Sequence, residues 1–514
     1  MNLRRIHIVV PRNRFLRWHQ RLRDRLQRVV PNTQAALRFE NAGEAWPEGV
    51  APLLSLEHLL LRRSRTALAD ALDPRAEAEA TRAPADIAID LAGEAQVGGA
   101  RVLRLRYDGE ISDRHAIASL LAGRAPTIAV EDAATGAILA QGLPSLEAAD
   151  GLTGGLDAVY SRATTLIEQA LTTPAPAFSP PAPRAPRAPK SPAAFAARSI
   201  AFETARKIYH LCCQAPHWRV GWRFTDGPGV LETGSLQGAP WRPMQDRELN
   251  FAADPFPCAW RGVDGVFYEH LDHRRGIGEI YFQRFDDDGP CGAPVQALEE
   301  PWHLSYPFLI EHDDQLYMMP EASTSGAISL YRCVEFPHRW EKAARLLDDI
   351  EAADATIFRH EGRFWMTSVV RNGVGGYSDT LALHYAHDLF GPWRPHAHQP
   401  ALVDSRFARP AGEIAHVDGE LLRPVQDCSQ GYGKRLVIMR IDELTPQTFR
   451  QTPLKVIEAD ARWPGSRLHT INRTGRIECI DGVVIAPRFL PLRRLTHRLL
   501  DARAARAARE TPSS

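Results

Sequence analysis

Ala253-Asp254-Pro255-Phe256 opens a pattern that recurs in the second half of this 514-residue chain. In each copy a polar residue starts a short aromatic or β-branched run, and an Asp-Gly or similar turn follows. The later copies open with Ser305-Tyr306-Pro307-Phe308-Leu309-Ile310-Glu311, Ala353-Asp354-Ala355-Thr356-Ile357-Phe358, Arg409-Pro410-Ala411-Gly412-Glu413-Ile414 and, more weakly, Leu468-His469-Thr470-Ile471-Asn472. Five units of roughly 50 residues match four-stranded blades, so the sequence predicts a five-bladed β-propeller over residues 199–490.

The polar residues of these units fall at corresponding positions, at the start of the first strand of each unit. In a propeller that strand lines the central channel. We therefore expect residues that are far apart in the sequence to converge on one axis, namely Asp254, His303 or Tyr306, Asp354, Arg409 and His469.

The first part of the chain has a different pattern, in which β-branched runs alternate with amphipathic segments. Strands are predicted at 3–10, 86–91, 102–107 and 127–131, and helices at 15–29, 53–72, 115–122 and 158–171. Residues 1–172 are therefore predicted to form an α/β domain with a mostly parallel sheet. Residues 173–198 contain TPAPAFSPPAPRAPRAPK and predict an extended spacer. Residues 491–514 predict a basic helical tail, either a solvated end or a surface for a membrane or a partner.

Composition excludes some classes of function. The chain is 44% hydrophobic, and its 62 Lys and Arg residues balance 62 Asp and Glu residues, which argues against a nucleic-acid-binding protein. The seven cysteines fit no zinc spacing, and neither a signal peptide nor a transmembrane segment is found. The sequence thus predicts a cytoplasmic location, with no metal and no cofactor.

Several motifs resemble a known domain. They are Ala253 to Phe256, His303-Leu304-Ser305-Tyr306-Pro307, Met319-Pro320-Glu321-Ala322-Ser323, Phe336-Pro337-His338-Arg339-Trp340, Gly391-Pro392-Trp393 through Pro400, Arg409 to Gly412, and Arg423-Pro424-Val425-Gln426-Asp427 through Gly433. In this order they resemble the N-terminal propeller domain of plant glucosamine inositolphosphorylceramide transferases and of many bacterial proteins of surface-polysaccharide loci. That domain is similar to the five-bladed propellers of arabinanases, xylosidases and invertases.

The resemblance implies a set of catalytic carboxylates, because propeller glycosidases use one acid and one base or nucleophile. By analogy Asp254 would be the base or nucleophile, Asp354 would tune protonation, and Glu413 would be the acid, with Glu321 as the alternative acid. Each carboxylate could instead cap a turn or a strand edge.

Further polar residues near the same axis are candidates for contacts with sugar hydroxyls, which carboxylate, guanidinium, amide and imidazole groups hold well. They are His303, Tyr306, His398, Arg409, Arg423, Gln426, Asp427 and His469. An inter-blade ion-pair network is the alternative for Arg409, Arg423, Gln426 and Asp427, and a structural role is the alternative for each histidine.

Residues 1–172 resemble the N-terminal domain of formyltransferases in three places: the strand at 86–91, Arg106-Tyr107-Asp108-Gly109, and Gly151-Leu152-Thr153 before the last helix. The Asn-His-Asp set that formyl transfer requires is missing, and His115 lies in a helical stretch. The sequence therefore predicts a Rossmann-like, formyltransferase-like domain that is inactive in formyl transfer.

Three functions remain open. The first is a carbohydrate-active protein of polysaccharide or glycoconjugate biosynthesis, whose pocket binds a sugar for glycosyl transfer or hydrolysis. The second is a non-catalytic module that binds a carbohydrate or glycoconjugate for a partner glycosyltransferase. The third is a formyl or other acyl transferase in the N-terminal half.

Overall fold

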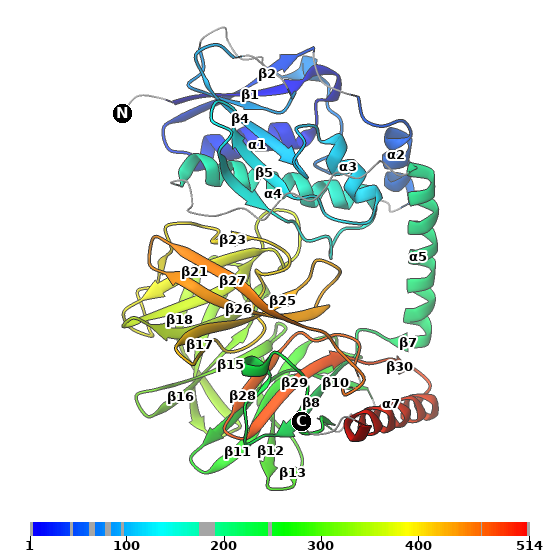
Figure 1. The fold of residues 1–514 in the computed structure, drawn as a ribbon, viewed down its shortest axis with the longest axis vertical. Coiled ribbons are helices and arrows are strands. Elements are labelled where there is room, and N and C mark those ends of the chain that lie inside the picture. The colour runs from blue at the N-terminus through cyan, green and yellow to red at the C-terminus, as the bar shows by residue number, and fades with distance from the viewer. Residues whose placement is uncertain are drawn as a thin grey trace. The chain divides into compact units, whose positions relative to one another are not determined.

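The structure is a computed structural model that divides into two compact units. It describes residues 4–41, 45–60, 67–77, 84–93, 97–173, 191–244, 249–463 and 465–510. One unit comprises residues 1–203 with 372–379 and 402–405, and the other comprises 204–371, 380–401 and 406–514 (Figure 1). Each unit has its own core and is described by itself.

The first unit is built on a six-stranded sheet with the order β2-β1-β3-β4-β5-β6. The pairs β1–β2, β1–β3 and β3–β4 are parallel, whereas β4–β5 and β5–β6 are antiparallel. The strands are β1 (Arg4–Pro11), β2 (Thr33–Glu40), β3 (Ile87–Asp90), β4 (Arg101–Tyr107), β5 (Ile128–Asp132) and β6 (Ile138–Gly142), and the unit also contains β23 (Leu402–Val403). The helices are α1 (Arg17–Val29), α2 (Val50–Leu60), α3 (Arg114–Leu121) and α4 (Gly151–Thr172), with 3-10 turns at Arg12–Arg14 and Pro74–Ala76.

This unit contains both strands and helices, but its sheet is mixed rather than mostly parallel, so the predicted Rossmann-like arrangement is not shown. All four predicted strands are present. β2 and β6 were not predicted. The helix predicted at 53–72 ends at Leu60; residues 61–66 lie outside the described chain, and 67–72 are not helical. The formyltransferase likeness stays a prediction.

The second unit contains five antiparallel sheets, which confirms the five-bladed propeller. Blade 1 has β10 (Asn250–Trp260), β11 (Val263–Asp272), β12 (Gly278–Asp286), β13 (Gly289–Pro290) and β14 (Val295–Leu298). Blade 2 has β15 (Ser305–His312), β16 (Gln315–Glu321), β17 (Ala327–Glu335) and β18 (Arg339–Asp348). Blade 3 has β19 (Ala352–His360), β20 (Arg363–Val370), β21 (Thr380–Ala386) and β22 (Arg394–Pro395). Blade 4 has β24 (Ala415–Val417), β25 (Glu420–Asp427), β26 (Arg435–Leu444) and β27 (Phe449–Ile457).

Blade 5 is assembled from both ends of the propeller sequence. β28 (Ile471–Thr474) and β29 (Ile477–Val483) pair with β8 (Trp218–Phe224) and β9 (Arg242–Pro243), which precede blade 1. Seven residues of β8 pair with β29, from Trp218 opposite Val483 to Phe224 opposite Ile477. The ring is therefore closed by hydrogen bonds, within blade 5, between β8 from the start of the domain and β29 from its end.

Helical segments flank the propeller strands. They are α5 (Pro192–Cys212), α6 (Val230–Thr233), a 3-10 turn at Ser323–Ser325 and α7 (Leu490–Glu510), and a short pair joins β7 (Cys213–Gln214) to β30 (Ala486–Pro487). Residues 192–198, expected in an extended spacer, are helical, and residues 174–190 lie outside the described chain. The predicted tail helix is present as α7, but it is not a detached solvated end, because Arg493, His497 and Ala504 are buried. Within the described chain, every helix is too short or too polar to cross a bilayer.

Candidate functional site

The sequence repeat corresponds to a repeat in the backbone. Asp254, Tyr306 and Asp354 start the first strands of blades 1 to 3, and their φ angles are +49°, +44° and +52°. At each of them the pairing with the next strand shifts register, which marks a β-bulge. A bulge bends the strand and redirects a side chain, and positive φ is unusual for residues other than glycine. Three successive blades therefore turn one polar side chain in the same irregular way.

Asp254 is surrounded by donors from two neighbouring blades, 2 and 5. Its Oδ1 accepts from the Thr470 hydroxyl at 2.5 Å and lies 3.5 Å from Nε2 of His469. Its Oδ2 accepts from the backbone N–H of Tyr306 at 3.3 Å. Burial raises the pKa of Asp254 to about 6, while the nearby His469 acts in the opposite direction. This carboxyl group therefore titrates just below neutral pH.

Asp354 is held by blade 4. Its Oδ2 accepts from Nε of Arg409 at 2.7 Å and from the Gln426 side-chain amide at 3.1 Å. Arg409 also approaches Glu321 of blade 2 at 3.8 Å, and its guanidinium lies 4.6 Å from the ring centroid of Tyr432. Burial raises the pKa of Asp354 to about 7, because it outweighs the opposing effect of Arg409. About half of the Asp354 carboxyl groups are therefore protonated at neutral pH.

His469 of blade 5 completes the ring of polar groups. It stacks on Trp218 with 3.9 Å between ring centroids, and its Nδ1 lies 2.6 Å from Oδ1 of Asp481. Asp481 also accepts from the backbone N–H groups of Asp254 and Thr470, both at 2.9 Å. Burial lowers the pKa of His469, but Asp481 and Asp254 outweigh it, so the net shift is upward. The imidazolium is therefore favoured beside two carboxylates.

The two candidate glutamates lie in different settings. Glu321, at the end of β16, faces Arg409 and accepts from the Ser323 hydroxyl at 3.2 Å. Glu413 keeps a solvent-exposed side chain, and its backbone N–H donates to Asn472 of blade 5 at 2.8 Å. Burial by the surrounding blades raises the pKa of Glu413. Of the four predicted acids, Glu413 is thus the one that combines access to solvent with a raised pKa.

The structure thus brings together ten polar residues from all five blades. Seven of them were predicted: Asp254, Tyr306, Glu321, Asp354, Arg409, Gln426 and His469. Three were not: Glu269, Tyr432 and Asp481. Glu269, opposite Ala253 in the β10–β11 pair, is buried, and burial followed by Asp254 and Glu321 raises its pKa well above the usual range. Glu269 and Asp481 lie on second strands, outside the repeated motif, so the repeat could not identify them.

Four other predicted residues have different surroundings. His303 accepts from the N–H of Gly278 and lies 3.3 Å from Glu269, at the margin of the cluster. Arg423 is buried and donates to the carbonyls of residues 407 and 408, so it supports the segment that carries Arg409. Asp427 pairs with Arg435 on the neighbouring strand of the same blade at 2.8 Å, so this pair is not the inter-blade contact that the alternative described. The backbone of His398 is hydrogen-bonded to the His396 ring, and its imidazole also interacts with the Gln447 backbone; neither residue belongs to the cluster.

One group of side chains has the composition of a metal site. Ligand atoms of Asp254, His469 and Asp481 lie within 4.8 Å of one another, and among the described residues this is the one such group. Hydrogen bonds occupy these atoms: Oδ1 of Asp481 accepts from the ring and the N–H of His469 and from the N–H of Thr470. A metal ion at this position would have to displace these donors.

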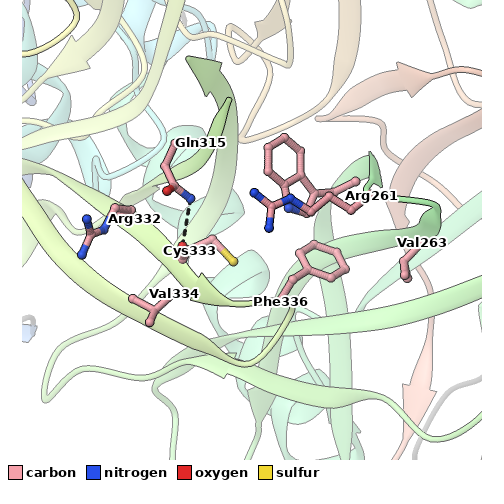
Figure 2. A pocket seen from close by; sticks show the side chains of 8 residues that line it. Arg261, Val263, Gln315, Arg332, Cys333, Val334 and Phe336 are labelled. Carbon is pink, nitrogen blue, oxygen red and sulfur yellow. Dashed lines mark hydrogen bonds between the residues drawn. The ribbon is translucent and has the colours of Figure 1, made fainter. Parts of the chain in front are cut away.

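A separate hollow of about 370 Å³ lies at the other ends of the strands of blades 1 and 2 (Figure 2). It is lined by Trp260, Arg261, Val263, Gln315, Arg332, Cys333, Val334 and Phe336. Figure 2 shows the Gln315 amide donating to the Cys333 carbonyl, at 3.0 Å. In the β10–β11 pair, Ala253 lies opposite Glu269 at the end near the cluster. Trp260 lies opposite Val263 at the other end of the same two strands, next to the hollow. The hollow contains no residue of the cluster.

Comparisons with known proteins identify relatives of the propeller region. The family model described as "Glucosamine inositolphosphorylceramide transferase 1, N-terminal" matches residues 244–480. The protein of that name from Arabidopsis thaliana is 33% identical over 229 residues, which cover 43% of this chain and 30% of the relative. The protein from Oryza sativa subsp. indica is 30% identical over 233 residues, which cover 43% of this chain and 31% of the relative. The match thus spans less than a third of these relatives' length.

Among solved structures, a GH43_1 enzyme from Xanthomonas citri aligns with a TM-score of 0.32 and 13% identity, covering 47% of this chain and 91% of that chain. The family 117 glycoside hydrolase Zg3597 from Zobellia galactanivorans aligns with a TM-score of 0.32 and 12% identity, covering 47% and 76%. The resemblance seen in the sequence is confirmed by the family match: residues 244–480 form a propeller domain of the type found at the N-terminus of glucosamine inositolphosphorylceramide transferase 1.

Proposed function

We propose that the polar cluster of the propeller binds a sugar unit of a glycoconjugate, and that its carboxyl groups take part in glycosyl transfer or hydrolysis. The observation that carries this proposal is the pair of buried aspartates, Asp254 and Asp354, whose pKa values lie near 6 and 7. Strongly shifted carboxyl groups with specific charged partners are typical of functional sites.

The surroundings of the acids suggest a division of roles. Asp254 is largely ionised at neutral pH, which suits a base or nucleophile. Glu413 combines a raised pKa with access to solvent, which suits proton donation to a leaving oxygen. Arg409 holds Asp354 and reaches toward Glu321, so it would position both of these acids. Donors from neighbouring blades could also hold the hydroxyls of a sugar.

The ligand class follows from the relatives, whose name describes a glucosamine transferase acting on an inositolphosphorylceramide. We propose a nucleotide-activated hexosamine as the donor and a lipid-linked or polymeric glycan as the acceptor. A suitable test incubates the full chain with nucleotide-activated glucosamine and a panel of glycan acceptors, and detects product by mass spectrometry. Asp254→Asn should abolish the product and leave folding intact.

The control is Asp348→Asn, at an exposed carboxylate that pairs with Arg345 on the outer strand of blade 2. This variant should keep the wild-type rate. Full product formation by Asp254→Asn would contradict the catalytic proposal. Wild-type protein that neither binds any glycan of the panel nor forms product would contradict the sugar site as a whole.

A second function is favoured by one observation: both carboxylate oxygens of Asp254 already accept hydrogen bonds, and its side chain is 6% exposed. A site with its acids occupied in this way suits a non-catalytic module that holds a glycan for a partner glycosyltransferase. In that case the wild-type chain binds glycans of the panel but yields no product, and Asp254→Asn weakens binding.

A further inference from the structure

The C-terminal helix α7 packs with its polar side inward. The side chains of Arg493 and His497, four residues apart and hence on one face, are buried at 4% and 7% exposure. Arg493 donates to the Pro487 carbonyl and to the Gln214 side chain, and Nε2 of His497 lies 3.2 Å from the carbonyl of Ile485. Asp501 pairs with Arg219 of β8 at 2.7 Å. Polar contacts thus fix this helix to the propeller.

The outward face of the same helix is apolar. Leu492, Leu495 and Leu499 follow the three- and four-residue spacing of one helical face, and they are 49%, 53% and 63% exposed. A surface helix normally turns its leucines toward the core and its charges toward water. On α7 this arrangement is inverted, so burial against this domain does not account for the leucine face.

The apolar surface continues beyond the helix. The segment that leads into α7 exposes Ile485 and Phe489. Near the end of α5, Ile208 and Leu211 are exposed as well. Backbone N–H of Arg488 donates to the carbonyl of Cys212, and its side chain donates to the carbonyl of His210, so the two segments lie side by side. Exposed large apolar side chains in such a group mark an interaction surface.

The charge of this surface is positive. Arg488, Arg498 and Arg503 are exposed beside the leucines, and no carboxylate of the described residues pairs with Arg498 or Arg503. The one acidic side chain that the structure describes on α7 is Asp501, which pairs with Arg219. Arginine side chains can extend along apolar surface and place their charge at a lipid headgroup. A leucine face flanked by arginines is the pattern of helices that lie in the membrane interface.

We propose that α7 and the adjoining residues Ile485, Phe489, Ile208 and Leu211 dock this protein onto an anionic lipid surface, with the leucines entering the headgroup–acyl boundary. This docking does not depend on the proposed sugar site. Docking of this kind would hold the propeller close to lipid-linked molecules, and it would not require a membrane-spanning segment in this protein.

Flotation of the full chain with lipid vesicles tests the proposal. The protein should float with vesicles of mixed phosphatidylcholine and phosphatidylserine, and much less with phosphatidylcholine alone or at high salt. Leu495→Glu/Leu499→Glu should abolish flotation, since each buried leucine is worth at least about tenfold in partitioning. Arg498→Gln/Arg503→Gln should lower partitioning roughly fivefold for each arginine.

Matched controls use exposed residues elsewhere on the propeller. Leu454→Glu on β27 removes a leucine that is 39% exposed, and Arg345→Gln removes an arginine paired with Asp348. Both variants should float like the wild type, as should Asp254→Asn. Wild-type protein that does not float, or a leucine variant that floats unchanged, would overturn the proposal. So would light scattering that shows a dimer, dissociated by the leucine variant, without vesicle binding.

Discussion

The Thr470 hydroxyl donates a 2.5 Å hydrogen bond to Oδ1 of Asp254, although 216 positions of the chain separate the two residues. Asp254 lies in blade 1, and Thr470 directly precedes the first strand of blade 5. Blade 5 itself is completed by the pairing of β29 with β8, which precedes blade 1 in the sequence. The Thr470 hydrogen bond therefore joins Asp254 of blade 1 to the blade that closes the ring, and a change at Thr470 should affect both the cluster and this blade.

Thr470→Val tests this junction, because valine keeps the shape of threonine and removes the hydroxyl. The hydrogen bond lowers the pKa of Asp254, so the variant should raise this pKa further. It should also cost about 1–2 kcal/mol of stability, because a buried carboxyl oxygen loses its donor. Carbon-13 NMR of the aspartate carboxyl groups across a pH titration measures the first effect, and urea unfolding measures the second.

The control for this change is Thr367→Val. Thr367 is also fully buried, but its hydroxyl has no hydrogen-bond partner among the described residues. Its replacement should be neutral or slightly stabilising. Equal losses of stability in the two variants would show that the Thr470 hydroxyl contributes only by packing.

Titration of Asp354 should make the stability of the protein depend on pH. Its pKa is about 7 in the folded protein and 3.8 as the ordinary value. As the pH rises, Asp354 loses its proton near pH 4 in the unfolded chain but only near pH 7 in the folded protein. The contribution of Asp354 to the free energy of unfolding therefore falls steadily between about pH 4 and pH 7. The slope from one such group is at most about 1.4 kcal/mol per pH unit. Asp354→Asn should remove this slope from a series of unfolding curves.

Asp272→Asn is the control of opposite sign. The Arg274 side chain lowers the pKa of Asp272 to about 2, so the contribution of Asp272 is lost only as the pH falls below about 4. This variant should leave the slope between pH 4 and pH 7 as it is in the wild type. Asp254, whose pKa is about 6, contributes a slope of the same sign at lower pH, so the test of Asp354 is the slope between about pH 6 and pH 7. An unchanged slope there in Asp354→Asn would assign the pH dependence to another group, such as Glu269.

The repeat identified Asp254, Tyr306 and Asp354, because the first strands of blades 1 to 3 each carry a polar residue at the same bulge. Glu321 and Gln426 lie on second strands and were found through the resemblance instead. Glu269 and Asp481, also on second strands, were missed because neither the repeat nor the resemblance motifs include them. His398 was assigned as a histidine near the proposed rim, and its ring lies beside that of His396.

The repeat also did not predict how the propeller ring closes, which is by strands from both ends of the domain in one blade. The fifth blade has only two strands after blade 4, and its partners β8 and β9 precede blade 1. Pairing between distant segments depends on the geometry of the complete ring, which no local pattern of hydrophobic residues records. The sequence likewise predicted α7 from its Arg- and Ala-rich composition, but not that Arg493 and His497 would be buried.

Gly221→Ala should damage the closing blade. A Cβ atom at this position of β8 would lie 2.2 Å from the ring of Trp463, which is almost fully buried. Overpacking of this kind typically costs about 1–3 kcal/mol. The matched change Gly227→Ala meets no atom within 4 Å and should be nearly neutral. Thermal unfolding of the two variants compares them directly, and equal melting temperatures would show that the Trp463 ring can move aside.

Arg423→Met should lower both stability and the order of the cluster. Arg423 is fully buried, and burial lowers its pKa to about 9. Its guanidinium donates to the carbonyls of Phe407 at 2.9 Å and Ala408 at 2.5 Å, immediately before Arg409. Methionine fills similar space but leaves both carbonyls without this donor, which should cost about 2–4 kcal/mol in urea unfolding.

The control is Arg440→Met, at a half-exposed arginine that pairs with Glu420 and Asp442. Because surface ion pairs contribute little, this variant should be nearly neutral. The effect of Arg423 on the site is positional, since Arg409 carries the contact with Asp354. Arg423→Met should therefore also shift the titration of Asp354, read by carbon-13 NMR, whereas Arg440→Met should not. A stable Arg423→Met protein with an unchanged Asp354 titration would mean that the segment before Arg409 holds its position without this guanidinium.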